Sequence, residues 1–453
     1  MLPESFIQSL EGLPGFEKEA FIATHQNGEQ VTSLRLNAFK TFEINNHPFL
    51  HNPSQIPWCT NGFYLEERPL FVKDPLWHVG AYYVQEASSM FLHFILTQLY
   101  PNASDQIVLD LCAAPGGKST LLANYFDKGL VLANETIKNR NHILVENITK
   151  WGQDNVVVTQ NDPAHFKSLP SFFDLVLIDA PCSGSGLFRK DPKAIEEWSL
   201  DHVQHCSTRQ TRIIDDSWES IKEGGYLIYA TCSYSKAEDE KIMDYIASLE
   251  GMKNIPISIP SSFNIVETES DLHHAKGYRA YPNLIKGEGF FIAVFQKEYS
   301  NGGYAISKEH HLLPATKIEK ELVANIFTLP EEKYLISHQQ NLMALNAHWK
   351  ESLEIISSQL YIKKIGLYIG TVKGKDLIPS HDLAMSTWSS KPYNTFEIDL
   401  ETALQFLRRA DLHIEGVKGW VLLTYMNIGL GWIKALPNRS NNYYPNEWRI
   451  LNY

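Results

Sequence analysis

From about residue 80 to residue 300, the chain alternates between short apolar runs and longer segments with helical spacing. Each apolar run is almost continuous, which is typical of strands in a parallel sheet covered by helices on both faces. The alternation therefore predicts an α/β fold with a Rossmann-like sheet. The five runs are "QIVLDLC", "GLVLANE", "NVVVTQND", "FDLVLIDAP" and "GGYLIYATC".

The two ends of the chain follow other patterns. A short helix-like opening precedes extended pieces and the proline-rich "HNPSQIPW", whereas "YVQEASSMFLHFILTQLY" has helical spacing. We expect "FNIVETE" and "GEGFFIAVFQKE" to form an edge hairpin, and "KEYSNGGYAISKEHH" has the glycine and polar residues of a linker. The expected regions are an N-terminal region, a sheet domain, a connecting subdomain and a C-terminal β domain, at residues 1–75, 76–300, 301–375 and 376–453.

Composition narrows the class of protein. The chain has 453 residues, of which 44% are hydrophobic, enough for two or three cores. A formal net charge of −12 argues against a general nucleic-acid coat protein, but not against an enzyme that meets RNA through a local basic face. No apolar run is long enough to span a bilayer, and the N-terminus does not resemble a secretory signal, so we expect a cytoplasmic protein without a membrane partner.

The five cysteines are an odd number and include no CxxC pair. A disulfide framework or a structural zinc site is therefore disfavoured, and reduced thiols fit best. His202, His205 and Cys206 share one polar helical segment, where we expect them to lie on different faces. The sequence predicts no metal site.

The segment "VLDLCAAPGGKST" predicts a strand, a turn of small residues and a helix. Such a turn lies at the carboxyl end of its strand, where open α/β sheets bind ligands. A phosphate-binding loop would need glycine five residues before Gly117, where Cys112 stands, and the GxGxxG fingerprint is also absent. The turn after Asp110 instead suits a ligand without phosphates, such as S-adenosylmethionine.

Acids follow the next three strands. Glu135 can accept hydrogen bonds from both ribose hydroxyls, Asp162 lies where an adenine amino group is expected, and Asp179 ends the fourth strand. Any one of them could simply cap a helix or face water. Together with Asp110, they occur at successive strand ends beside a small-residue turn, which favours a cofactor site.

Two cysteines also stand at strand ends, Cys182 after the fourth strand and Cys232 after the fifth. Carbon 5 of cytosine is a poor nucleophile, and a thiolate that adds to carbon 6 activates it. Ser235 and Glu238 match a capping box, so a helix is expected to begin just beyond Cys232 and to favour its thiolate. Either cysteine alone could be a small buried apolar residue, but the pair favours chemistry. Enzymes that methylate amino groups usually carry Asp/Asn-Pro-Pro-aromatic where this chain has "DAPC".

Four ordered segments, "YVQEASSM", "LDLCAAPGGKST", "DAPCSGSGLFRKDP" and "YATCSYSKAEDE", together with "SLRLNAFK", resemble the Sun-type (NOL/NOP/Sun) RNA 5-methylcytosine methyltransferases over about residues 30 to 297. The resemblance implies that Cys232 is the nucleophile, that Cys182 acts in product release as a base, and that Asp179 positions the cytosine. It also implies an S-adenosyl-L-methionine site formed by Cys112, Ala113, Ala114, Pro115, Gly116, Gly117, Lys118, Glu135, Asp162 and Asp179.

The C-terminal stretch "GWVLLTYMNIGLGWIKALPNRSNNYYPNEWRIL" interleaves basic and aromatic residues. This composition suits RNA contacts, but a small β-barrel with a core of aromatic residues would have it too. The stretch resembles the PUA-like tail of the RsmF branch, which implies RNA binding at both ends of the chain and ribosomal RNA, in the small subunit, as partner. The alternatives are an enzyme that methylates transfer RNA and a non-catalytic assembly factor. A cysteine hydrolase is disfavoured, because the sequence offers no obvious histidine partner for either thiol. We expect a monomer.

Overall fold

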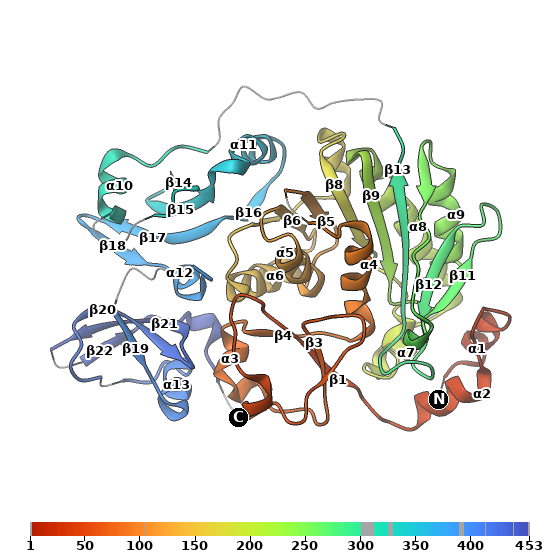
Figure 1. The fold of residues 1–453 in the computed structure, drawn as a ribbon, viewed down its shortest axis with the longest axis horizontal. Coiled ribbons are helices and arrows are strands. Elements are labelled where there is room, and N and C mark those ends of the chain that lie inside the picture. The colour runs from red at the N-terminus through yellow and green to blue at the C-terminus, as the bar shows by residue number, and fades with distance from the viewer. Residues whose placement is uncertain are drawn as a thin grey trace.

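The computed structural model describes residues 2–103, 105–299, 312–324, 329–388, 394–412, 414–437 and 439–451. Within them, ten strands form a central sheet, with the N-terminal region on one edge and two further small sheets on the C-terminal side (Figure 1). The linker expected at residues 297–311 lies, beyond Tyr299, outside the described residues.

The middle of the central sheet is parallel, and all five predicted strands are present. Their spatial order is β7-β6-β5-β8-β9, so the direction of the strand order reverses between β5 and β8. Carboxyl ends of parallel strands meet at one edge, and ligands bind beside such a reversal. The strands are β5 (Ile107–Asp110), β6 (Leu130–Asn134), β7 (Val156–Thr159), β8 (Phe173–Asp179) and β9 (Ile221–Thr231).

Helices cover both faces of this sheet, as its apolar strands require. On one face, Leu144 and Ile148 of α6 pack with residues of α4 and α5. On the other face, Ile213 of α8 and Met243 of α9 pack against the sheet. The predicted α/β architecture is therefore confirmed. The helices are α4 (Phe91–Leu99), α5 (Gly117–Tyr125), α6 (Lys138–Trp151), α8 (Leu200–Ser217) and α9 (Glu240–Ser248).

Antiparallel strands extend the sheet beyond β9. The predicted edge hairpin is wrong, because β11 does not pair with β13; β12 lies between them and pairs with both. The short "KGYRA" was missed within a turn-rich stretch. These strands are β10 (Met252–Asn254), β11 (Val266–Glu269), β12 (Lys276–Ala280) and β13 (Phe290–Lys297).

At the opposite edge, the C-terminal part of the chain joins the central sheet. Strand β16 (Ile362–Ile365) pairs antiparallel with β7, and helix α11 (Lys350–Gln359) buries Ile356 against the sheet. The short, polar sequence "IKKI" gives no sign that β16 would join a buried sheet. The segment expected to connect two domains therefore completes the edge of the central sheet.

The N-terminal region divides into two parts. Phe6 and Phe21, from the first two helices, pack against Phe188 and Tyr234 beside the carboxyl edge of the central sheet, and Figure 1 shows these helices next to α7 (Pro192–Glu197). Tyr83 and Val84, predicted as the start of a helical segment, belong instead to strand β4, which pairs with β1. The elements are α1 (Glu4–Leu10), α2 (Lys18–Gln26), β1 (Thr32–Leu36), β2 (Ser54–Gln55), β3 (Gly62–Leu65), α3 (Pro75–His78) and β4 (Tyr82–Val84).

Two antiparallel-rich sheets form the C-terminal side. In the second of them, β20 and β21 are joined by a tight turn at Met426 and Asn427, whose φ values of 50° and 62° suit the turns that match strand twist. The elements are α10 (Lys317–Ala324), β14 (Lys333–His338), β15 (Asn341–Asn346), β17 (Leu367–Lys373), β18 (Asp376–Pro379), α12 (His381–Met385), β19 (Asn394–Glu397), α13 (Leu400–Leu407), β20 (Gly419–Tyr425), β21 (Ile428–Leu436) and β22 (Arg439–Asn442).

The carboxyl end of α6 is where the three parts of the chain meet. Asn37 Nδ2 donates to the carbonyls of Gly80 (3.0 Å) and Trp151 (2.9 Å). Lys40 Nζ donates to the Lys150 carbonyl at 2.6 Å, where a cation also complements the negative end of the helix dipole. From the C-terminal side, the Thr387 amide donates to the Gly152 carbonyl. Final-turn carbonyls of a helix lack partners within it, so these donors hold the parts together.

Asn37→Ala is expected to lower the free energy of unfolding by about 2 to 4 kcal/mol, because two buried carbonyls lose their donor. Urea unfolding followed by circular dichroism measures the change. Asn139→Ala, at an exposed position of the same helix, is the control and is expected to change little. Equal effects of the two substitutions would show that the Asn37 bonds do not stabilise the junction.

Candidate functional site

Cys182 and Cys232 lie next to each other at the carboxyl edge of the sheet, with 3.1 Å between their sulfur atoms. Their closeness follows from the parallel pairing of β8 with β9, in which Asp179 stands opposite Ala230. Beyond the last strand residues, the amide of Ala180 donates to Ala230 and the amide of Gly186 donates to the Cys232 carbonyl at 2.7 Å. A Cβ at position 186 would lie 2.5 Å from that carbonyl oxygen, so the close approach of the two loops requires glycine.

The two thiols are not electrostatically equivalent. The hydrogen bond to Cys232, together with burial, raises the pKa of the Cys182 thiol well above its ordinary value. A thiol that keeps its proton is a donor, so Cys232 Sγ is the acceptor when the Cys182 proton points between them.

The predicted capping box at Ser235 is wrong. Helix α9 begins only at Glu240, and no side chain caps it. Ser235 and Glu238 lie in the turn before the helix, where Glu238 is completely buried and accepts hydrogen bonds from the residues that follow each cysteine, Ser183 and Ser233. Helix α9 therefore does not begin directly after Cys232, as had been expected. The S-x-x-E pattern cannot distinguish a glutamate that reaches back to its own helix from one that reaches across to another loop.

Two further acids next to Glu238 are buried with a single arginine. Arg279 on β12 contacts Asp239 at 2.9 Å and Glu240 at 2.5 Å. Burial, followed by the neighbouring charges, raises the pKa of Asp239 well above its ordinary value, although Arg279 opposes the shift. Asp239 also accepts from Thr231 Oγ1, one residue before Cys232. Thr231, Asp239, Glu240 and Arg279 thus form a buried network of hydrogen bonds and ion pairs next to Cys232.

The small-residue turn at residues 112–117 joins β5 to α5. Gly116 has a φ of 112°, a conformation that favours glycine. Behind the turn, Asp110 is buried and accepts from Ser119 Oγ at 2.6 Å. Because α5 begins at Gly117, the amides of its first turn point towards the ligand edge without partners inside the helix.

A buried arginine from the N-terminal region supports this turn. Arg35 on β1 donates to the Gly117 carbonyl at 3.1 Å and to Thr120 Oγ1 at 2.6 Å, and its guanidinium lies over the ring of Trp151. Gln85 accepts from Arg35 as well. Burial lowers the pKa of Arg35 to about 10, so it remains charged at neutral pH.

The three strand-end acids lie along the same edge but have different partners. Glu135 is buried, and its carboxylate accepts from the Ile137 amide at 2.8 Å and lies 3.4 Å from Arg140. Asp162 is partly exposed and caps the following turn. Asp179 forms an ion pair with Lys118 of the turn, at 2.7 Å, with a third of its side chain exposed. The structure thus places Asp179 and Lys118 between the cysteine loops and the small-residue turn.

These residues fit S-adenosylmethionine. The turn offers backbone amides and little side-chain bulk, and the acids at the edge offer acceptors for hydroxyl and ammonium groups. Arg140 also donates to the Ala114 carbonyl, so it connects the turn with Glu135. The structure thus brings residues 112–118 and the acids Glu135, Asp162 and Asp179, predicted as the cofactor site, to the same edge of the sheet.

Three polar residues of this region were not predicted from the sequence: Arg35, Arg140 and Glu238. Arg35 and Glu238 stand in quoted motifs, but three of their partners, Gln85 and Thr120 for Arg35 and Ser183 for Glu238, are between 50 and 85 positions away in the chain. No local pattern reveals a partner at such a separation. Arg140, in the first turn of α6, could have been suspected because a cation five residues after Glu135 can reach back to it.

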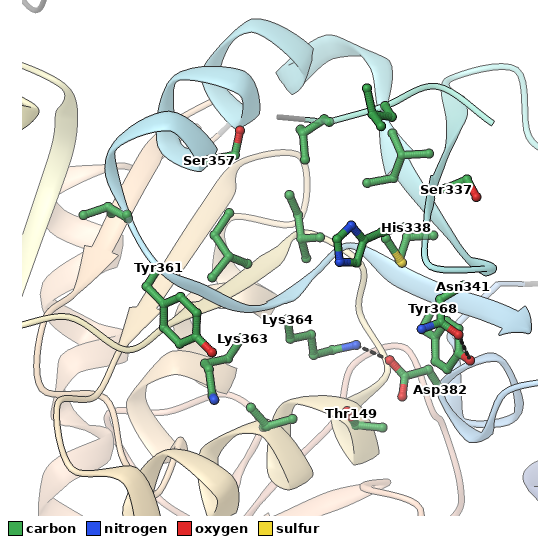
Figure 2. Close-up of a pocket in the computed structure, with 18 residues that line it drawn as sticks. Thr149, Ser337, His338, Asn341, Ser357, Tyr361, Lys363, Lys364, Tyr368 and Asp382 are labelled. Atoms are coloured by element: carbon green, nitrogen blue, oxygen red, sulfur yellow. Dashed lines mark hydrogen bonds and ion pairs between the residues drawn. The ribbon is translucent and has the colours of Figure 1, made fainter. Parts of the chain in front are cut away.

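A hollow of about 570 Å³ lies elsewhere, between α6 and the strands β14 to β17, and Figure 2 shows Lys364 pointing to Asp382 across it. None of the predicted site residues lines it. Among the described residues, no group of three or more histidine, cysteine or acidic side chains could hold a metal ion. In the same part of the chain, no helix has the length and apolarity needed to cross a membrane.

The C-terminal aromatic residues divide between core and surface. Tyr444 is buried against Phe406 and His381. Tyr443 is 37% exposed and its ring lies against Trp420, over which Lys434 extends its ammonium group. Tyr444 therefore belongs to the core, whereas contact of the exposed Tyr443 with RNA stays a prediction.

Comparisons with known proteins agree along the whole chain. The sequence model of 16S rRNA methyltransferase RsmB/F matches residues 96–296, the N-terminal domain of 16S rRNA methyltransferase RsmF matches residues 2–87, and the methyltransferase RsmF PUA domain matches residues 393–450. Ribosomal RNA small subunit methyltransferase F of Vibrio cholerae is 31% identical over 98% of this chain and 97% of its own. The Escherichia coli protein of the same name is 28% identical over 98% and 96%.

Solved structures show the same fold. A methyltransferase homolog protein from Pyrococcus horikoshii is 27% identical, with a TM-score of 0.52 over 65% of this chain and all of its own. NSun6 from the same organism, solved with SFG, is 21% identical, with a TM-score of 0.54 over 66% and 99%. The N-terminal, sheet and PUA parts expected from the sequence are therefore confirmed as the architecture.

Asp110 generates a prediction on pH dependence. Burial raises its pKa to about 7 in the folded chain, above the ordinary value of 3.8, so between these values only the folded state holds the proton. The stability contributed by that proton is present below pH 4 and is lost as the pH rises to about 7, by at most roughly 1.4 kcal/mol per pH unit.

Asp110→Asn is expected to remove this loss, so the free energy of unfolding of the variant relative to wild type rises between pH 4.5 and 7.5. Urea unfolding at several pH values measures it, with Asp127→Asn at an exposed site as control. Parallel pH profiles of wild type and Asp110→Asn would contradict the shift.

Proposed function

Because the chain belongs to the ribosomal RNA small subunit methyltransferase F family, we propose that it transfers a methyl group from S-adenosylmethionine to carbon 5 of a cytidine in small-subunit ribosomal RNA. The observation that carries the proposal is the pair of thiols 3.1 Å apart beside the small-residue turn. A methyl transfer to nitrogen or to ribose needs no thiol, whereas transfer to carbon 5 of a pyrimidine needs a nucleophile at carbon 6.

In this mechanism Cys232 is the nucleophile. Its sulfur adds to carbon 6 of the cytosine, and the electrons of the 5,6 double bond become available at carbon 5. Bound S-adenosylmethionine supplies the methyl group as an electrophile. The hydrogen bond to Cys232 and burial raise the pKa of the Cys182 thiol, so Cys182 is the donor of the pair and we assign the attack to the Cys232 sulfur.

Cys182 then acts in product release. Once the Cys232 sulfur is bonded to carbon 6, it no longer carries the charge that helps to keep the proton on Cys182, and the Cys182 thiol releases that proton to water. The resulting thiolate removes the proton from methylated carbon 5, the electrons of that C–H bond restore the 5,6 double bond, and the bond between carbon 6 and Cys232 breaks with its electrons returning to the Cys232 sulfur. The 3.1 Å distance between the sulfur atoms supports this role, because the base is then close to the carbon next to the adduct.

Asp179 is proposed to hold the amidine edge of the cytosine. Its carboxylate lies on the strand that precedes Cys182 and is a third exposed, so it can accept a hydrogen bond from the base. Lys118, paired with Asp179, connects this position to the cofactor turn. Through these two residues, one carboxylate contacts both substrates.

The parts flanking the sheet domain are proposed to bind the RNA. A groove of about 680 Å³ in the C-terminal domain is lined by Arg409, Arg439 and the amides Asn441 and Asn442, which suits phosphate and ribose contacts. A target base must leave its stack to reach Cys232, so the preferred cytidine is unpaired or easily opened. The domains assigned to RNA contact are residues 1–75 and 376–453, with residues 301–375 between the latter and the catalytic domain at 76–300.

The test is labelled methyl transfer to unmethylated small ribosomal subunits and to their naked RNA, with the product nucleoside identified by mass spectrometry. Wild type is expected to form 5-methylcytidine, and Cys232→Ala is expected to form none because the ring is not activated. Cys182→Ala is expected to accumulate an RNA–protein adduct that survives denaturation. Cys206→Ala, which replaces a buried thiol of α8, is the control and is expected to retain activity.

Other outcomes would revise the proposal in distinct ways. An adduct with Cys232→Ala in place of Cys182→Ala would exchange the roles of the two thiols. A methylated nucleoside other than 5-methylcytidine would reject carbon 5 as the acceptor, and product on transfer RNA alone would reject the ribosomal substrate.

A further inference from the structure

Each reactive cysteine is followed by a serine, and one carboxylate binds both serines. Glu238 Oε2 accepts from Ser183 Oγ at 2.5 Å and from Ser233 Oγ at 2.6 Å. Its other oxygen, Oε1, accepts from the Ser183 amide at 2.8 Å and from Gln210 Nε2 at 3.2 Å. An ionised carboxylate has about four acceptor positions, and all of them are used here.

Glu238 is itself held firmly. Its side chain has no exposed surface, and its backbone carbonyl accepts from the Tyr229 hydroxyl at 2.7 Å. The next residue, Asp239, contacts Arg279 and Thr231. The carboxylate is therefore a fixed point to which the residues after the cysteines are attached.

Other bonds between the two loops lie on either side of Cys182. The Ala180 amide donates to Ala230 before it, and Ser185 Oγ accepts from the Tyr234 amide after it. Between these positions, Ser183 is bonded to Glu238 through both its amide and its hydroxyl, and Gln210 also donates to the Pro181 carbonyl. The orientation of Cys182 thus depends on the position of the Glu238 carboxylate.

We infer that Glu238 is a positioning residue that sets the separation of the Cys182 and Cys232 sulfur atoms by binding the serine after each of them. The inference rests on the proposed function for its catalytic consequence, but its geometric content concerns the thiols alone. Without the carboxylate, one amide and two hydroxyls are left in a buried region without their acceptor, and the Cys182 loop is released to find other partners.

A trivalent arsenical tests the geometry without any reaction on RNA. Phenylarsine oxide bridges two neighbouring thiols by forming two As–S bonds, while the two thiol protons and the arsenic-bound oxygen leave as water. Wild type is expected to be bridged at Cys182 and Cys232, as located by peptide mapping, and Cys182→Ala is expected to lose the bridge. The measured quantity is the concentration of reagent that half-saturates the bridge at this pair.

Glu238→Ala is expected to raise this concentration by about tenfold or more, because the thiols are no longer held together. Glu238→Gln keeps the volume and one carbonyl acceptor, and the serine hydroxyls can rotate to accept from its amide, so most of the bridging is expected to return. The double variant Ser183→Ala and Ser233→Ala is expected to weaken the bridge with Glu238 intact. It also keeps the test informative if Glu238→Ala does not fold.

Asp74→Ala is the matched control. Asp74 is also a fully buried acid that accepts from a backbone amide and a hydroxyl, those of Leu76 and Tyr82, but it lies in the N-terminal region. It is expected to lose stability without any change in arsenical bridging. Unchanged bridging in Glu238→Ala would overturn the inference, and so would a Glu238→Gln variant as poor as Glu238→Ala, since charge rather than position would then be required.

Kinetics supply the catalytic readout. Glu238→Ala is expected to lower kcat for methyl transfer by about a hundredfold, because misplacement by an ångström is enough, while the KM values change by less than about threefold. Weakened bridging together with absent methyl transfer by wild type would reject the proposed function and leave the positioning intact. Weakened bridging with unchanged kcat would show that the spacing of the sulfur atoms does not matter to the reaction.

Discussion

The parallel pairing of β8 with β9 is the interaction on which the site depends. It sets Asp179 opposite Ala230, so the loops that leave the two strands pass each other within a few residues. Both cysteines lie in these two loops, and so does Gly186, which allows the loops to approach each other. Because both strands are buried on both faces, a shift of register by one residue would exchange the side chains packed against the two helical layers, and close packing opposes such an exchange. The candidate site thus stands at the ends of two interior strands of the central sheet.

Around this support, buried polar groups are paired across long distances in sequence. Arg35 comes from the N-terminal sheet to the cofactor turn, Glu238 holds two loops, and Arg279 lies between two acids. Leaving one of these buried groups without its partner would cost more free energy than the pairing itself contributes to stability. The members of each pair therefore depend on one another. The same logic holds at the end of α6, where Asn37 and Lys40 bind carbonyls of the catalytic part. The flanking regions are thereby parts of one framework rather than independent attachments, as β16 in the central sheet also shows.

Local patterns succeeded where the signal was local. Continuous apolar runs identified β5 to β9, and the turn "CAAPGGK" was recognised because small residues between a strand and a helix have few other uses. Where the outcome depended on distant partners, the same reasoning failed. The capping box at Ser235 was wrong because the Glu238 carboxylate accepts from the loops after the two cysteines and from Gln210 of α8, and the edge hairpin was wrong because β12 inserts between its two strands. The place of β16 in the central sheet was missed, since its four residues carry two lysines and it is the pairing with β7 that puts them there.

By itself, the sequence determined the class of fold, the order of the parallel strands along the chain, the strand-end positions of the two cysteines and the acids, and the family to which these motifs point. All of these follow from short-range spacing, since burial of a strand or the shape of a turn depends on neighbouring residues. Only the tertiary structure decided which strands are adjacent, that the two sulfur atoms lie 3.1 Å apart, and which buried groups hold them there. Those features depend on pairings between residues far apart in the chain, whose free energy exists only once the sheet has assembled and water has been excluded.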